Sequence, residues 1–135
     1  MQQLVETAKT ARLLSVAPFS NFLVGAAVKT EAGMIYTGCN IESASYGLTV
    51  CGERVAIWKA LSEGERHFAE LAIVADTDTL TPPCGTCRQI IWEFARDATI
   101  ILANLHGENQ TVSIRELLPR AFDARFLAGA RKESS

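Results

Sequence analysis

The chain has 135 residues, of which 48% are hydrophobic and 21% are charged, and its formal net charge is −2. This length suits one domain over residues 1–135 with its own hydrophobic core, without a separate regulatory module. Lysine and arginine are scattered along the chain and form no basic patch, so a nucleic-acid polymer is not an expected partner.

The N-terminal region has no apolar run long enough for a signal peptide or a membrane span. We therefore expect a cytoplasmic protein without a membrane partner. The chain has four cysteines, which in a reducing compartment are more often metal ligands or buried side chains than disulfides. Cys39 is expected to be the buried one.

The N-terminal part of the chain is predicted to form a helix followed by a β-hairpin. Residues 2–16 carry apolar side chains at helical spacing, namely Leu4, Val5, Ala8, Ala11 and Leu14. Ala17-Pro18 ends this pattern. Two strand-like runs follow at 22–28 and 34–39, and the segment between them has the composition of a turn.

The central part alternates helical and strand-like segments. Residues 40–50 have no stable period and are expected to be a functional loop. A helix over 51–62 is apolar on most sides and is expected to be buried, with Gly64 at its end. Further segments predict strands at 71–75 and 99–103 and a helix between them, over 85–95.

The C-terminal part is less regular. Residues 105–112 predict a loop and a weak fifth strand, and Ser113, with Glu116 three residues later, predicts a capped short helix that Pro119 ends. The polar residues 130–135 are expected to fray.

Two segments carry a pattern typical of a catalytic zinc site. Cys51 and Glu53 form a Cys-x-Glu element, and Cys84 and Cys87 form a Pro-Cys-x-x-Cys element about thirty residues later. Three thiolates bind zinc and leave one tetrahedral position open, where water is activated near neutral pH. If helices begin at Cys51 and Cys84, the sulfurs lie beside N-terminal amides that favour thiolate.

Glu53 and Arg54 have roles that complement this metal. Glu53 is too close to Cys51 to be an independent ligand of the same ion, so its carboxylate is free to transfer protons. The order of residues matches the zinc deaminase signature, with cysteine in place of the usual histidine. Three thiolates leave the site net negative, and Arg54 is the candidate cation beside the sulfurs.

Other interpretations of the cysteines stay open at this point. Cys84 and Cys87 alone are also compatible with a redox pair or with half of a structural zinc site, for which Cys39 is a possible fourth ligand. A zinc-stabilised binding module without catalysis belongs to the same alternative. Neither interpretation gives Glu53 a role.

Several further motifs resemble those of the small homotetrameric cytidine deaminases, and the resemblance covers nearly the whole chain. They are Ala-Pro-Phe-Ser-Asn-Phe-Leu-Val-Gly-Ala-Ala at 17–27, Gly-Cys-Asn-Ile-Glu-Ser-Ala-Ser-Tyr-Gly at 38–47 and Glu-Leu-Leu-Pro at 116–119. The resemblance implies a three-layer α/β/α fold with a five-stranded mixed sheet, one Zn²⁺ per subunit, and active sites shared between neighbouring subunits of a homotetramer.

Residue roles follow from the same resemblance. Cys51, Cys84 and Cys87 match the zinc ligands and Glu53 the proton carrier, while Arg54 matches an arginine that contacts the thiolates. The expected substrate-binding residues are Asn40 and Glu42 for the ribose 3′-hydroxyl, Phe22 for stacking on the pyrimidine, and Tyr46 and Phe122 for lining adjacent sites.

The implied activity is hydrolysis of cytidine and deoxycytidine to uridine and deoxyuridine with release of ammonia, a step of pyrimidine salvage. A deaminase of a free base or of a nucleoside antibiotic is the nearest alternative, but it has no need of the Asn40 and Glu42 pair. Three positions depart from the family pattern: Phe19 for tyrosine, Gly52 for alanine and Arg120 for glycine. Gly52 is expected beside the departing 4-substituent, which suggests activity on bulkier N4-substituted cytidines.

Overall fold

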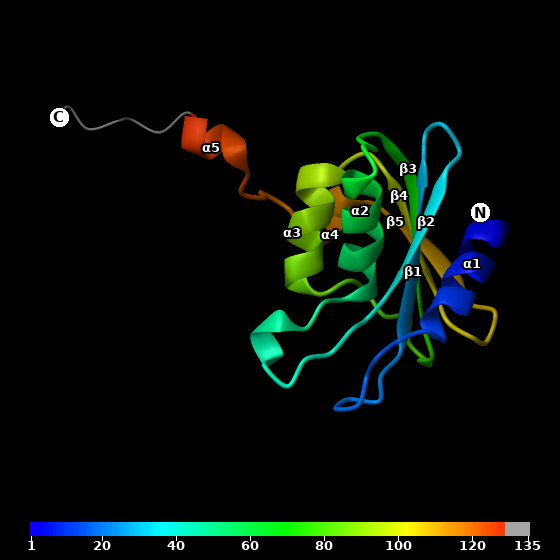
Figure 1. Ribbon diagram of the computed structural model, residues 1–135. Helices are drawn as coiled ribbons and strands as arrows, with labels where there is room; N and C mark the ends of the chain where they lie inside the picture. The colour runs from blue at the N-terminus through cyan, green and yellow to red at the C-terminus, as the bar shows by residue number, and fades with distance from the viewer. Residues whose placement is uncertain (129–135) are drawn as a thin grey trace.

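A computed structural model describes residues 1–128, so the predicted fraying of 130–135 lies outside the described residues. Figure 1 shows a sheet with α1 on one face and α2, α3 and α4 on the other. The elements in chain order are α1 (Gln2–Arg12), β1 (Val24–Thr30), β2 (Ile35–Cys39), a 3₁₀ turn (Tyr46–Leu48), α2 (Gly52–Ser62), β3 (Phe68–Ala75), α3 (Gly85–Phe94), β4 (Thr99–Ala103), β5 (Asn109–Val112), α4 (Ile114–Leu117) and α5 (Ala124–Ala128).

The sheet has five strands in the order β2-β1-β3-β4-β5 and is mixed, as expected. β1 is antiparallel to both β2 and β3, and β4 is antiparallel to β5. β3 and β4 are parallel, and the chain passes from one to the other through α3. This crossover confirms the predicted alternation and places the start of α3 at one end of the sheet.

Strand residues alternate between two hydrophobic clusters, one on each face of the sheet. Ala26 and Val28 of β1 face α2 and α3, whereas Ala27 faces α1. In β3, Ile73 and Ala72 are divided between the clusters in the same way. The helices therefore form two outer layers around the sheet, which confirms the three-layer α/β/α fold.

Some sequence-based boundaries were wrong. The first helix ends at Arg12, before the predicted end, and Leu14, assigned to its apolar stripe, is 75% exposed because it lies in the turn that follows. β3 begins earlier than predicted, at Phe68. α2 carries apolar residues on most sides and was expected to be buried, but Trp58 is 43% exposed.

The cysteine assignment also needs correction. Cys39, predicted to be the buried cysteine, is only partly buried at the end of β2, while Cys87 is fully buried within α3. Cys39 stays partly exposed because it ends an edge strand, where one side of the backbone has no neighbouring strand.

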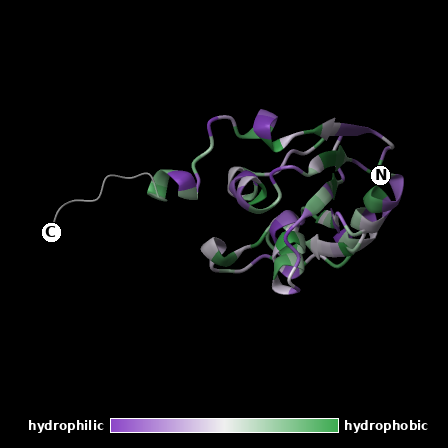
Figure 2. Cartoon of the chain, turned by 90° about the horizontal axis from the view of Figure 1, so that it is seen from above, coloured by the Kyte–Doolittle hydropathy of each residue, from purple (hydrophilic) through white to green (hydrophobic). Residues whose placement is uncertain are grey.

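The C-terminal segment packs along α3 and then leaves the layers. Ser113 and Glu116 form the predicted capping box at the start of α4. Arg120, which stands where the family has glycine, adopts a left-handed φ of 55°, a conformation that costs a non-glycine residue roughly 1–2 kcal/mol. Figure 2 shows α5 set apart from the layers, with hydrophobic residues on it. Within residues 1–128, no helix is both long and apolar enough to cross a membrane.

Candidate active site

The three predicted zinc ligands lie together at the N-terminal ends of α2 and α3. Cys51 is the N-cap residue of α2, Cys84 is the N-cap residue of α3, and Cys87 follows in the first turn of α3. Their three sulfur atoms all lie within 4.8 Å of one another, and the Sγ atoms of Cys51 and Cys84 are 3.6 Å apart. Cys39 is outside this cluster, so the described residues do not form a four-cysteine structural site.

The environment of the cluster favours thiolates. A hydrogen bond from Cys87, with a smaller contribution from Arg54, lowers the pKa of Cys51 to about 5. The same contact raises the pKa of Cys87, because that thiol then donates to its neighbour. Arg54 Nη2 donates to Cys51 Sγ at 3.8 Å and to the carbonyl oxygen of Thr49 at 3.1 Å. Arg54 is therefore the cation beside the sulfurs, as its position in the sequence suggested.

Glu53 is the buried acid of the site. Its side chain is only 3% exposed, and its Oε1 atom has no hydrogen-bond partner among the described residues. Burial raises the pKa of Glu53 to about 7. Such a carboxyl group is suited to accept a proton and return it near neutral pH.

These residues fit a zinc ion. Three converging cysteine sulfurs are the donors that zinc prefers, and three protein ligands leave one position for water or substrate, as catalytic zinc sites do. The Glu53 Oε1 atom beside them has no hydrogen-bond partner among the described residues, and a water molecule held at that position would supply one.

The cluster opens into a cavity of about 230 Å³, which we call the inner pocket. Its lining includes six of the residues predicted from the sequence: Phe22, Asn40, Glu42, Cys51, Glu53 and Cys84. Residues without a predicted role also line it, among them Thr81 and Pro82 from the loop before α3. The sequence contained a signal for these two, because they lie three and two residues before Cys84.

Asn40 holds the loop that carries Phe22. Its Nδ2 donates to the carbonyl oxygen of Phe22 at 2.7 Å, and its Oδ1 accepts from the backbone N–H of Val24 at 2.9 Å. The carboxamide has further donor and acceptor capacity after these two bonds. Asn40 is only 8% exposed. Through its two hydrogen bonds it fixes the start of β1, and it also lines the pocket.

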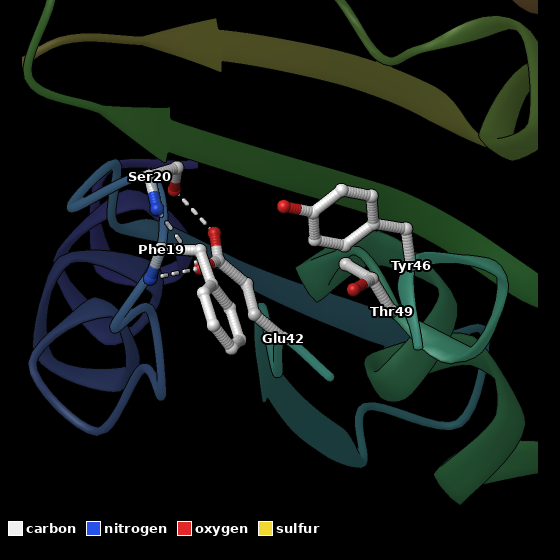
Figure 3. Close-up of a pocket in the computed structure, with 5 residues that line it drawn as sticks. All are labelled: Phe19, Ser20, Glu42, Tyr46 and Thr49. Atoms are coloured by element: carbon white, nitrogen blue, oxygen red, sulfur yellow. Dashed lines mark hydrogen bonds between the residues drawn. The ribbon is translucent and has the colours of Figure 1, made fainter. Parts of the chain in front are cut away.

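A second cavity, of about 360 Å³, adjoins the first and is called the outer pocket. Figure 3 shows Phe19, Ser20 and Glu42 on one side of it and Tyr46 and Thr49 on the other. Ser20, Glu42 and Thr49 line both pockets. Tyr46 thus lies near the site, and the Phe19 and Tyr46 rings make an edge-on contact with centroids 6.2 Å apart.

Gly52 does not have the position that the sequence analysis gave it. It is absent from the lining of both pockets, and its missing side chain would point toward β1 and β2. A Cβ atom there would lie 3.0 Å from the carbonyl oxygen of Val24 and 3.3 Å from Cys39 Cα. Glycine at this position therefore allows α2 to pack closely on the strands, and it forms no part of the wall of either pocket.

Phe122 is not brought into the pockets of its own chain. Its side chain is 57% exposed and stacks on Phe126, with ring centroids 5.7 Å apart. Gln89 of α3 donates to the Phe122 carbonyl oxygen at 2.8 Å, and Trp92 Nε1 donates to the buried Asp123 carboxylate at 3.0 Å. The helix that carries a metal ligand thus also anchors the segment that presents Phe122 at the surface.

Known proteins resemble this chain in sequence. The family model for the cytidine and deoxycytidylate deaminase zinc-binding region matches residues 1–103. A cytidine deaminase of Halalkalibacterium halodurans is 48% identical over 124 residues, which cover 91% of this chain and 94% of that protein. A cytidine deaminase of Sporosarcina psychrophila is 43% identical over 134 residues, covering 98% of each chain.

Solved structures of cytidine deaminases resemble the fold of this chain. The crystal structure of a cytidine deaminase from Burkholderia pseudomallei matches with a TM-score of 0.88 and 44% identity, covering 90% of this chain and 98% of that one. Sequence, fold and the three-cysteine cluster agree on the metal and on the reaction. The chain belongs to the family of zinc-dependent cytidine deaminases.

Proposed function

We propose that this protein hydrolyses cytidine and 2′-deoxycytidine to uridine and 2′-deoxyuridine and releases ammonia. The observation that carries this proposal is the buried carboxyl group of Glu53, whose Oε1 has no hydrogen-bond partner among the described residues, together with three converging thiols, two of which line the inner pocket. The pocket is of a size for a small molecule, and the scattered lysines and arginines of the sequence give no sign of a basic surface for a polymer.

Cys51, Cys84 and Cys87 are the residues proposed to hold zinc. When bound, zinc supplies a Lewis acid that lowers the pKa of a water molecule. Arg54 offsets the negative charge of the thiolates through its contact with Cys51. The N-termini of α2 and α3 favour the same ionised sulfurs.

Glu53 carries the protons in the proposed reaction. It accepts a proton from the water that attacks C4 of the pyrimidine and delivers that proton to N3. It then transfers the second proton of that water to the amino group, which leaves as ammonia while the C4 carbonyl forms. A buried carboxyl group with a pKa of about 7 gains and loses a proton readily at neutral pH.

The remaining pocket residues are proposed to bind the nucleoside. Phe22 stacks on the pyrimidine, and Asn40 and Glu42 contact the ribose 3′-hydroxyl with the donor and acceptor groups that they retain. Tyr46, from the outer pocket, lines the sugar side or an adjacent site. Gly52 is not included, because it lines neither pocket and its missing side chain would point at the backbone of Val24 and Cys39.

We also propose a cytoplasmic homotetramer of single-domain chains in which Phe122 enters the site of a neighbouring copy. Exposed hydrophobic side chains near this segment support an interface, since Phe122, Phe126 and Leu127 are all more than half exposed. Light scattering at assay concentration is expected to give the mass of four chains. An active monomer would contradict both the assembly and the shared role of Phe122.

The activity is tested with a panel of pyrimidine nucleosides and free cytosine, with product formation followed by loss of absorbance. We expect turnover of cytidine and 2′-deoxycytidine and little turnover of cytosine, because only the nucleosides engage Asn40 and Glu42. Faster turnover of the free base than of either nucleoside would contradict the substrate assignment.

A further inference from the structure

Ser20 connects two of the proposed substrate-binding residues. Its hydroxyl donates to Oε2 of Glu42 and accepts the backbone N–H of Phe22 at 3.0 Å. An ionised carboxylate only accepts hydrogen bonds, so the Ser20 hydroxyl proton is directed to Glu42 and its lone pair to Phe22. Figure 3 shows the Ser20 side chain pointing at Glu42 beside the pocket.

The contacts of Glu42 leave it limited capacity for a ligand. Oε1 accepts the backbone N–H groups of Phe19 at 2.9 Å and of Ser20 at 3.1 Å, and Oε2 accepts the Ser20 hydroxyl. A carboxylate offers about four acceptor sites, so one remains, on Oε2. The Ser20 hydrogen bond also lowers the pKa of Glu42, which keeps this remaining site an acceptor for a ligand hydroxyl.

We propose that Ser20 is a positioning residue that sets the selectivity of the enzyme for nucleosides carrying a 3′-hydroxyl, by fixing the free acceptor site of Glu42 relative to Phe22. This inference rests on the proposed function, in which Glu42 binds the sugar and Phe22 stacks on the base. Ser20 lines both pockets, and its hydroxyl holds the carboxylate oxygen from which the free site is directed.

The loop does not depend on the Ser20 hydroxyl for its general course. Asn40 holds the Phe22 carbonyl oxygen and the Val24 N–H group, and Asn21 N–H donates to the Ala17 carbonyl oxygen at 3.0 Å. The exposed Ser20 side chain contributes no buried volume. Loss of its hydroxyl is therefore expected to free Oε2 of Glu42, while Oε1 keeps its two backbone hydrogen bonds and the loop stays in place.

The test compares 2′-deoxycytidine with 2′,3′-dideoxycytidine, which differ only in the 3′-hydroxyl. For Ser20→Ala we expect the ratio of their kcat/KM values to fall about tenfold, the effect of weakening one hydrogen bond to a charged group. The loss should appear as a higher KM for 2′-deoxycytidine with kcat nearly unchanged. The dideoxy nucleoside should be affected little.

Two further variants serve as controls. Ser20→Thr keeps the hydroxyl and is expected to restore most of the ratio. Ser15→Ala removes another hydroxyl, which donates to the Val24 carbonyl oxygen at 3.4 Å and not to the Glu42 carboxylate. This variant is expected to leave the ratio unchanged.

Four results would overturn the inference, and they are distinguishable. If Ser20→Ala lowered kcat/KM equally for both nucleosides, the role of Ser20 would be purely structural. If it lowered neither value, Ser20 would have no role. In both cases the assignment of Glu42 would stand. A wild-type enzyme that does not discriminate between the two nucleosides would remove the Glu42 assignment as well. A wild-type protein that deaminates neither nucleoside would remove the proposed function itself.

Discussion

Replacing Glu53 by glutamine is expected to lower kcat for cytidine by about a thousandfold, the middle of the range for loss of a general acid–base group. Glutamine keeps the shape of the side chain but cannot accept a proton from water or return it to N3. The zinc content should stay at one ion per chain, because Glu53 is not a ligand of the proposed site. Steady-state kinetics and elemental analysis of the same preparation measure both quantities.

Glu63→Gln is the matched control for Glu53→Gln. It makes the same chemical change at the other end of α2, where Glu63 is exposed and distant in sequence from the cysteines. Activity should be unchanged in this variant. If Glu53→Gln kept kcat within about tenfold of the wild type, a difference of only ~1.4 kcal/mol in barrier, the assigned role would be wrong.

Gly25→Ala is expected to be the most damaging single-methyl change to the fold. Gly25 of β1 lies against α1, and a Cβ atom there would lie 2.6 Å from Arg12 N and 2.8 Å from Arg12 Cβ, and closer still to the carbonyl oxygen of Ala8. These atoms of α1 belong to its backbone or are bonded directly to it and cannot move independently, so the whole helix must shift on the sheet. Overpacking of this kind costs about 3 kcal/mol or more, which corresponds to a fall in Tm of roughly 10 °C.

The control for this substitution is Gly47→Ala. No atom lies within 4 Å of a Cβ at Gly47, and its backbone φ is not positive, so Tm should change little. Differential scanning calorimetry of both variants measures the difference. If Gly25→Ala unfolded within about 2 °C of the wild type, the close approach of α1 to β1 would not be as described.

The metal site was the most predictable part of the molecule, because its geometry follows from local sequence. The spacing of Cys84 and Cys87 places both sulfurs in one helical turn, and both Cys51 and Cys84 begin helices as expected. α2 connects β2 to β3 and α3 connects β3 to β4, and these three strands run in the same direction, so the two helix starts lie at one end of the sheet. Short-range rules and one topological rule were sufficient here.

The parts that the sequence did not predict depend on contacts between distant segments. The role of Ser20 arises from a hydrogen bond to a residue 22 positions later, which no local pattern encodes. α5 was missed because it has only five residues, Ala124–Ala128, too few to show a helical period in the sequence. Gly52 was placed beside the substrate from its neighbours in sequence, but the direction of its missing Cβ depends on how α2 packs on the sheet.

Zinc content measured on the wild type and on two cysteine variants tests the central claim most directly. Cys87→Ser removes a sulfur from the three-membered cluster, whereas Cys39→Ser changes a cysteine outside it. We predict one zinc per chain for the wild type and for Cys39→Ser, and a large loss of zinc together with cytidine hydrolysis for Cys87→Ser. Loss of zinc from Cys39→Ser, or full zinc content in Cys87→Ser, would contradict a catalytic site built from Cys51, Cys84 and Cys87.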